Sequence, residues 1–175
     1  MTIMIIGGTG FLGSNLARHL IQNKNEAGVV MFDASPNYAR IADIQDQVTV
    51  VQGDMLESTE LLESMKRHDV DQVVHLAYVL GPGQGSNPLR TIRINCMGTT
   101  NVFETARLHG VKRVVFSSSG GLHPLRNTLT DEEVNEDVIP RPDSIYGACK
   151  LFNECEADIY WNMFGLDVIG LRPTG

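Results

Sequence analysis

Short apolar runs alternate with amphipathic stretches along almost the whole chain. The runs are rich in β-branched residues, which is typical of strands buried on both faces of a sheet. The predicted strands are Thr2–Ile6, Ala27–Phe32, Val48–Gln52, Gln72–Ala77, Val111–Phe116 and Leu166–Leu171. The predicted helices are Phe11–Asn23, Glu57–Arg67, Leu89–His109 and Ser144–Phe164, with a short helix also expected near Ala39–Ile44.

The alternation of strands and helices predicts an α/β fold with a doubly wound parallel sheet, because parallel strands need crossover connections. We expect a single domain over residues 1–175. Two loops without periodicity, Gly81–Pro88 and Gly120–Asp143, follow the fourth and fifth predicted strands. Open α/β sheets bind ligands at the carboxyl ends of their strands, so these loops are expected to border a site.

Composition and charge exclude several classes of protein. A hydrophobic content of 42% with 20% charged residues is ordinary for a globular protein, and the net charge of −7 argues against nucleic-acid or anionic membrane partners. Without a signal-like or membrane-spanning apolar segment, the cytoplasm is the expected compartment. The odd set of Cys96, Cys149 and Cys155 has no metal-ligand spacing, so we expect neither disulfides nor a metal site.

A glycine-rich segment, Gly7–Gly13, connects the first predicted strand to the first predicted helix. Gly7 is expected to permit a tight turn, Gly10 to let the backbone approach a pyrophosphate, and Gly13 to let helix and strand pack closely. Amides at the helix start, aided by the helix dipole, would face the phosphates. Such glycines also occur in ordinary turns, but the strand before and the helix after them favour dinucleotide binding.

An acidic residue, Asp33, ends the second strand twenty residues after Gly13. A carboxylate there accepts a hydrogen bond from the adenosine ribose 2′-hydroxyl and repels a 2′-phosphate, so NAD is favoured over NADP. The alternative is that Asp33 only caps a turn. Asp54 and Met55 follow the third strand and would suit the amino group and the ring face of adenine.

A tyrosine and a lysine, Tyr146 and Lys150, have the i, i+4 spacing of one helix face. An ammonium beside a phenol is expected to lower the tyrosine pKa and make it an acid/base for hydride chemistry. The spacing is common by chance. Its place one strand–loop unit after Ser117–Ser119 favours the functional interpretation.

In order along the chain, these segments resemble the extended short-chain dehydrogenase/reductase family, in its NAD-dependent epimerase/dehydratase group. The shared pattern comprises Gly7–Gly13, Asp33, Gly53–Met55, His75–Ala77, Asn95, Gly98–Thr99, Phe116–Ser119, Tyr146–Lys150 and Leu171–Gly175. The resemblance implies an NAD(P)-binding Rossmann fold and hydride transfer to or from a hydroxyl or carbonyl group of a sugar, a sugar-nucleotide or a related small substrate.

The resemblance also implies roles for single residues. Tyr146 would be the acid/base, Lys150 would hold the nicotinamide ribose, and Ser119 would hydrogen-bond the reacting oxygen. The implied cofactor-binding residues are Gly7, Gly10, Phe11, Leu12, Gly13, Asp33, Asp54, Met55, Leu76, Ala77, Tyr78, Asn95, Ser117, Tyr146, Lys150, Leu171 and Pro173. Ser118 and His75 are expected to be structural, and Asn95 could equally stabilise the fold.

The chain departs from the family pattern in two places. The Thr-Asp-Glu triplet of sugar-nucleotide 4,6-dehydratases is absent after the fifth strand, and Thr130–Glu132 lies too far along the loop to replace it. Epimerisation or simple oxidoreduction is therefore favoured over dehydration. The resemblance also implies a C-terminal substrate-binding region after the segment that matches Leu171–Gly175, where this sequence ends. A fragment, a truncated product and a natural half-length protein would all fit this.

Two functions remain open at this point: an NAD-dependent enzyme, and a binding module that holds NAD with little turnover. A folded relic is disfavoured because Ser119, Tyr146 and Lys150 are all present. The helices predicted over Leu89–His109 and Ser144–Phe164 match those of the family's dimeric four-helix bundle. The resemblance thus implies a homodimer, although the same helix faces could pack only on the sheet.

Overall fold

The computed structural model describes residues 1–23, 28–79, 87–123 and 138–173. Its strands are β1 (Thr2–Ile6), β2 (Gly28–Asp33), β3 (Thr49–Gln52), β4 (Gln72–His75), β5 (Arg113–Ser117) and β6 (Val168–Leu171). Its α-helices are α1 (Phe11–Gln22), α2 (Ser58–Arg67), α4 (Pro88–Ile92), α5 (Thr99–His109) and α6 (Ile145–Phe164). A π-helical turn, Arg93–Gly98, joins α4 to α5, and 3-10 turns occupy Tyr38–Ile41, Gln45–Gln47 and Gly120–Leu122.

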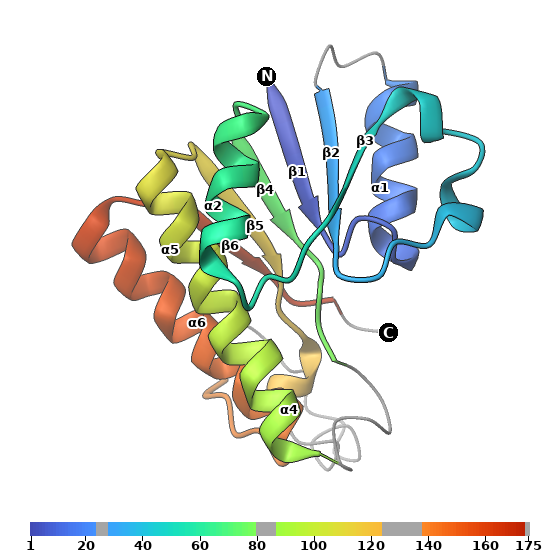
Figure 1. Cartoon of the computed structure of the whole chain (residues 1–175). Helices are drawn as coiled ribbons and strands as arrows, with labels where there is room; N and C mark the ends of the chain where they lie inside the picture. Colours follow the sequence, from blue (N-terminus) through green and yellow to red (C-terminus); the bar gives the residue numbers. More distant parts are fainter. Residues whose placement is uncertain (24–27, 80–86, 124–137, 174–175) are drawn as a thin grey trace.

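All strand pairs are parallel, in the order β3-β2-β1-β4-β5-β6, which confirms the predicted doubly wound sheet (Figure 1). The chain order reverses beside β1, whose last residue, Ile6, is in register with Phe32 of β2 and His75 of β4. Crossovers therefore leave β1 in opposite directions. That reversal opens a crevice at the carboxyl end of β1, where sheets of this kind bind ligands.

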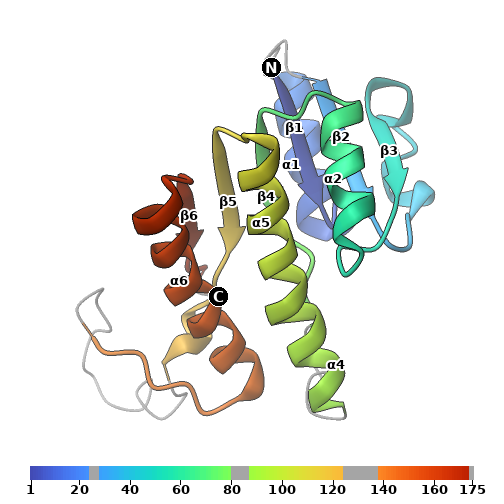
Figure 2. The same ribbon diagram turned by 60° about the vertical axis from the view of Figure 1, so that its left-hand side comes forward.

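Helices pack on both faces of the sheet. Helices α2, α5 and α6 lie on one face, and α1 lies on the other, over β1 and β2 (Figures 1 and 2). A hydrophobic core lies on each face of the sheet. Alternate residues of β1 point to opposite faces, so Met4 belongs to the larger core and Ile5 to the smaller one. In the larger core, Phe103 makes edge-to-face contacts with Phe116 and Tyr160, with ring centroids 5.5 and 5.7 Å apart.

Local sequence signals set several helix ends. Helices α5 and α6 end at Gly110 and Gly165, whose positive φ angles of 83° and 70° are left-handed conformations that glycine adopts without strain. At the other end of α6, the Ser144 hydroxyl accepts the N–H of Gly147. This cap fixes where α6 begins, and so fixes the position of the residues in its first turns.

The predicted elements are present, and their bounds differ by a few residues. The helix predicted over Leu89–His109 contains the π-helical turn, which its apolar pattern does not reveal. The short helix expected near Ala39–Ile44 is instead the 3-10 turn Tyr38–Ile41. Most of the loops predicted at Gly81–Pro88 and Gly120–Asp143 lies outside the described residues.

The Phe103 side chain should be a main contributor to stability, because it is wholly buried between Phe116 and Tyr160. We expect Phe103→Ala to lower the free energy of unfolding by about 3–5 kcal/mol in urea titrations followed by circular dichroism. Leu108→Ala on the same helix is the control, because Leu108 is 54% exposed. Equal losses in the two variants would contradict this description of the core.

Candidate functional site

The turn from β1 into α1 is closely packed on three sides. Gly7 has a φ of +78°, and a Cβ there would lie 2.9 Å from the backbone nitrogen of Ala77. A Cβ on Gly8 would lie 2.6 Å from the Cβ of Met31, and one on Gly13 would lie 2.5 Å from two carbonyl oxygens of the turn. The tight turn predicted at Gly7 is therefore present. The closest approach to the sheet comes from Gly8, whereas Gly13 makes room for the turn itself.

Helix α1 begins at this turn without a side-chain cap. Gly10 is its N-cap residue, and the first turn contains no acidic side chain. The amides there carry the positive end of the helix dipole, an arrangement that suits a phosphate group. Phe11 and Leu12, in the first turn, are 71% and 55% exposed. This end of α1 is therefore open to a ligand, and the pyrophosphate there stays a prediction.

A cavity of about 100 Å³ opens beside the turn, at the carboxyl ends of β1, β2 and β3. Its lining residues are Ile6, Gly7, Phe32, Asp33, Ala34, Gly53, Asp54, Met55 and Ala77. Several residues predicted to bind the cofactor from separate segments are thus brought together. Met55 is buried and provides an apolar wall, whereas Asp54 is exposed at the rim. This combination suits an adenosine.

Thr9 holds the carboxylate of Asp33 in place. Its N–H and its hydroxyl donate to Asp33 Oδ2 at 3.1 and 2.6 Å, and Asp33 Oδ1 accepts the N–H of Ser35 at 3.1 Å. Asp33 therefore caps a turn, as the alternative interpretation held, and also lines the cavity. The sequence analysis did not predict this role of Thr9. The one feature that could have indicated it is a hydroxyl side chain within the glycine-rich turn.

Buried polar contacts fix the segment that follows β4. Both the N–H and the carbonyl of Val79 are paired with the Asn95 side-chain amide, at 2.9 and 3.2 Å. Asn95 therefore supports the fold, which was one of its two predicted roles. His75 is wholly buried, and its Nε2 lies 3.0 Å from the Thr99 hydroxyl. Burial lowers the His75 pKa to about 3, so the ring is neutral and structural, as expected.

The two serines that follow β5, Ser118 and Ser119, have different surroundings. Ser118 is wholly buried and donates to Glu154, as expected for a structural residue. The Glu154 carboxylate also accepts two hydrogen bonds from Arg172, at 2.9 and 2.6 Å. Ser119 accepts the N–H of Gly121 at 3.0 Å. Glu154 and Arg172 were missed, although Glu154 follows Lys150 at the i+4 spacing of one helix face.

The segment after β6 lies beside these serines. The Ser118 N–H donates to the Leu171 carbonyl at 2.7 Å, and the Gly120 N–H donates to the Pro173 carbonyl at 3.1 Å. Leu171 is 57% exposed. The predicted cofactor residues Leu171 and Pro173 are thus held next to the carboxyl end of β5 by backbone hydrogen bonds.

Tyr146 and Lys150 lie one turn apart on α6. Lys150 is wholly buried, its Nζ donates to the Ser117 carbonyl, and this nitrogen lies 5.4 Å from the Tyr146 ring centroid. Burial lowers the Lys150 pKa to about 6. Burial also raises the Tyr146 pKa, and a hydrogen bond with Ser119 opposes that rise. The Tyr146 pKa is therefore raised and not lowered as predicted, because burial outweighs the Ser119 hydrogen bond while the Lys150 amine is engaged by the Ser117 carbonyl.

No described helix combines the length and the apolar character that crossing a bilayer requires. Nor do the described histidine, cysteine, aspartate and glutamate side chains form a group of three that could hold a metal ion.

Comparison with known proteins identifies the family of this chain. The model of the NAD dependent epimerase/dehydratase family matches residues 3–175. The chain belongs to this family. It is 31% identical to the UDP-glucose 4-epimerase of Mycolicibacterium smegmatis, over 99% of this chain and 56% of that protein. It is 29% identical to the uronate dehydrogenase of Pseudomonas putida, over 97% of this chain and 59% of that protein.

A solved structure agrees with this assignment. The UDP-glucose 4-epimerase from Brucella ovis in complex with NAD superposes with a TM-score of 0.86 at 26% identity, covering 98% of this chain and 51% of that one. The chain thus spans between one half and three fifths of the length of these family members.

A buried lysine whose folded-state pKa lies below its ordinary value costs stability. That cost is largest below about pH 6 and falls as the pH rises toward the unfolded value, because the folded state then binds fewer protons than the unfolded state. We expect Lys150→Met to raise the free energy of unfolding by about 1–4 kcal/mol near pH 6, and by less near pH 9. Urea titrations at both pH values measure this.

The matched control is Lys66→Met, because Lys66 is exposed on α2. It should leave the free energy of unfolding nearly unchanged at both pH values. A stability gain in Lys150→Met that is absent, or the same at both pH values, would show that Lys150 is not a buried amine with a lowered pKa.

Proposed function

We propose that the chain is the NAD-binding part of an oxidoreductase or epimerase that acts on a hydroxyl or carbonyl group of a sugar, a sugar-nucleotide or a related small substrate. One observation carries the proposal. The uncapped start of α1, the cavity at Asp33 and the group formed by Ser119, Tyr146 and Lys150 all lie at the carboxyl edge of one parallel sheet. A dinucleotide laid along that edge would reach from the cavity to the catalytic group.

Different residues of the crevice would bind different parts of the cofactor. The amides at the start of α1 would hold the pyrophosphate. Asp33 Oδ1 would accept a hydrogen bond from the adenosine ribose 2′-hydroxyl. This oxygen has a second lone pair besides the one that accepts the Ser35 N–H. Met55 would pack on the adenine ring. A carboxylate at the ribose disfavours a 2′-phosphate, so we propose NAD rather than NADP.

The catalytic group handles the proton. Bound NAD supplies the hydride acceptor. Tyr146, as phenolate, would take the proton of the substrate hydroxyl, while Ser119 donates a hydrogen bond to the same oxygen. Because burial raises the Tyr146 pKa, the phenolate needs a nearby positive charge. Lys150 would supply it by turning from the Ser117 carbonyl toward Tyr146 and the nicotinamide ribose.

A homodimer is part of the proposal. Apolar side chains are exposed along α4, α6 and the π-helical turn before α5, with Ile92, Met97, Phe152 and Ile159 each between 45% and 56% exposed. Exposed apolar surface of this extent favours association. A second copy of the chain packed on these helices would cover it.

A second candidate function is an NAD-binding module with little turnover. It is supported by the described site itself, in which burial raises the Tyr146 pKa and so disfavours the phenolate that turnover would need. The two functions share the cofactor site. They differ only in whether a substrate reaches Ser119 and Tyr146.

Cofactor binding is the first test. We expect the fluorescence of NADH to change on titration with the chain, and NADPH to bind at least about tenfold more weakly. Gly13→Ala should abolish NADH binding, because the added Cβ would lie 2.5 Å from two carbonyl oxygens of the turn. Gly28→Ala is the control, since its Cβ would come no closer than 3.5 Å to another atom. No NADH binding by the unaltered chain would refute the proposal.

The role of Tyr146 is tested by turnover with UDP-glucose and with uronates. We expect Tyr146→Phe to reduce turnover by about 10²–10⁴-fold and to leave NADH binding within a few-fold. Tyr160→Phe on the same helix is the control, because its hydroxyl contacts only Glu104 among the hydrogen bonds described. Turnover that survives in Tyr146→Phe would remove Tyr146 from the reaction. Binding without turnover in the unaltered chain would select the binding module.

A further inference from the structure

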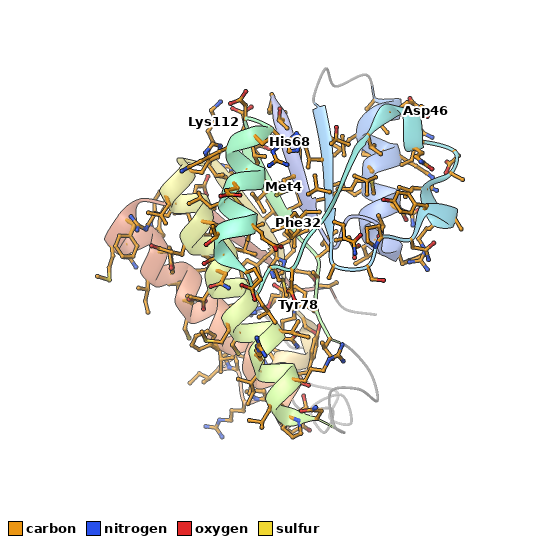
Figure 3. The ribbon with its side chains drawn as sticks, in the orientation of Figure 1. Met4, Phe32, Asp46, His68, Tyr78 and Lys112 are labelled. Carbon is orange, nitrogen blue, oxygen red and sulfur yellow. The ribbon has the colours of Figure 1, made fainter. Side chains whose placement is uncertain are left out.

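The closest ring to the Lys150 amine is one that the catalytic group does not include. Lys150 Nζ lies 2.7 Å from the centroid of the Tyr78 ring, about half its distance from the Tyr146 ring centroid. Tyr78 follows the carboxyl end of β4, at the lower edge of the sheet in Figure 3. A cation over the face of an aromatic ring is attracted by the ring's negative face, most strongly where water is excluded.

The Tyr78 ring is held in place by the core below it. Its centroid lies 4.5 Å from that of His75, and the backbone of the next residue, Val79, is pinned by Asn95 on both sides. The hydroxyl is buried near Thr99 and Asn153 with no hydrogen-bond partner among the described residues, and burial raises the Tyr78 pKa. The phenol therefore stays neutral. It presents a ring face to the amine, not a counter-charge.

The other groups around the amine offset only part of the effect of burial on its charge: Cys149 and Glu154 raise the Lys150 pKa, and burial lowers it more. From β4 there is His75, which is neutral because burial keeps its pKa at about 3. From α6 there are Tyr146, Cys149 and Glu154, and the Glu154 carboxylate is already engaged by Arg172 and Ser118. Burial is the largest influence on the Lys150 pKa, which it lowers.

We infer that Tyr78 is a positioning residue for Lys150. The face of the Tyr78 ring holds the ammonium form of the Lys150 amine at the end of β4. The Ser117 carbonyl and the ring together define where the amine rests. The consequence for catalysis rests on the proposed function: the ring sets how far the amine must move to reach Tyr146 and a bound ribose.

The test is a titration of the lysine side chains by nuclear magnetic resonance. The sequence has four lysines, Lys24, Lys66, Lys112 and Lys150, so ¹³Cε labelling gives few signals, and the Lys150 signal is assigned by its loss in Lys150→Met. Tyr78→Phe keeps the ring and should leave the Lys150 pKa unchanged. Tyr78→Leu removes the ring and should lower that pKa by about 0.5–1.5. The signals of the other lysines should not move.

A second measurement needs no variant, in case Tyr78→Leu does not fold. Protons above an aromatic ring face are shielded, so the ε protons of Lys150 should resonate upfield of those of the other three lysines. An unchanged Lys150 pKa in folded Tyr78→Leu, or the absence of the upfield shift in the unaltered chain, would overturn the inference. Neither measurement uses NADH, so a failure to bind NADH would refute the proposed function and leave this inference standing.

Discussion

Backbones of three strand ends meet at the carboxyl end of β1, and the whole site depends on that contact. A Cβ on Gly7 would lie 2.9 Å from the backbone of Ala77 beyond β4, and a Cβ on Gly8 would lie 2.6 Å from the Cβ of Met31 in β2. Only residues without a Cβ fit there, because protein interiors are packed without spare volume. The turn is tight enough for α1 to begin directly at the crevice. Its amides, the Asp33 cavity and the end of β4 therefore face the same space.

The second demand on the fold is the burial of Lys150. An amine whose pKa is lowered to about 6 destabilises the folded state, and a methionine of similar length would pack there at lower cost. Proteins keep such residues where activity requires them, and the surrounding structure bears the cost. Here the Ser117 carbonyl and the Tyr78 ring both contact the amine, which lies 5.4 Å from the Tyr146 ring centroid one turn away on α6.

The sequence predicted features that depend on the order of strands, turns and helices. It did not predict contacts that depend on the direction of individual side chains. Gly7 and Asp33 were found because their spacing marks a strand, a turn and a helix. The contact between Lys150 and Tyr78 joins segments far apart in the chain, so spacing carried no signal for it. The spacing of Tyr146 and Lys150 gave a shared helix face correctly. It did not give the rotamers, which place the amine against the Ser117 carbonyl and the Tyr78 ring. Burial then dominates the Tyr146 pKa and raises it.

A crystal structure of the chain grown with NADH would show whether the crevice beside β1 binds an adenine dinucleotide. We expect the pyrophosphate against the first amides of α1 and the adenosine ribose 2′-hydroxyl within hydrogen-bond distance of Asp33 Oδ1. NADH bound elsewhere, or a ribose that Asp33 does not contact while its carboxylate stays with Thr9 and Ser35, would contradict it.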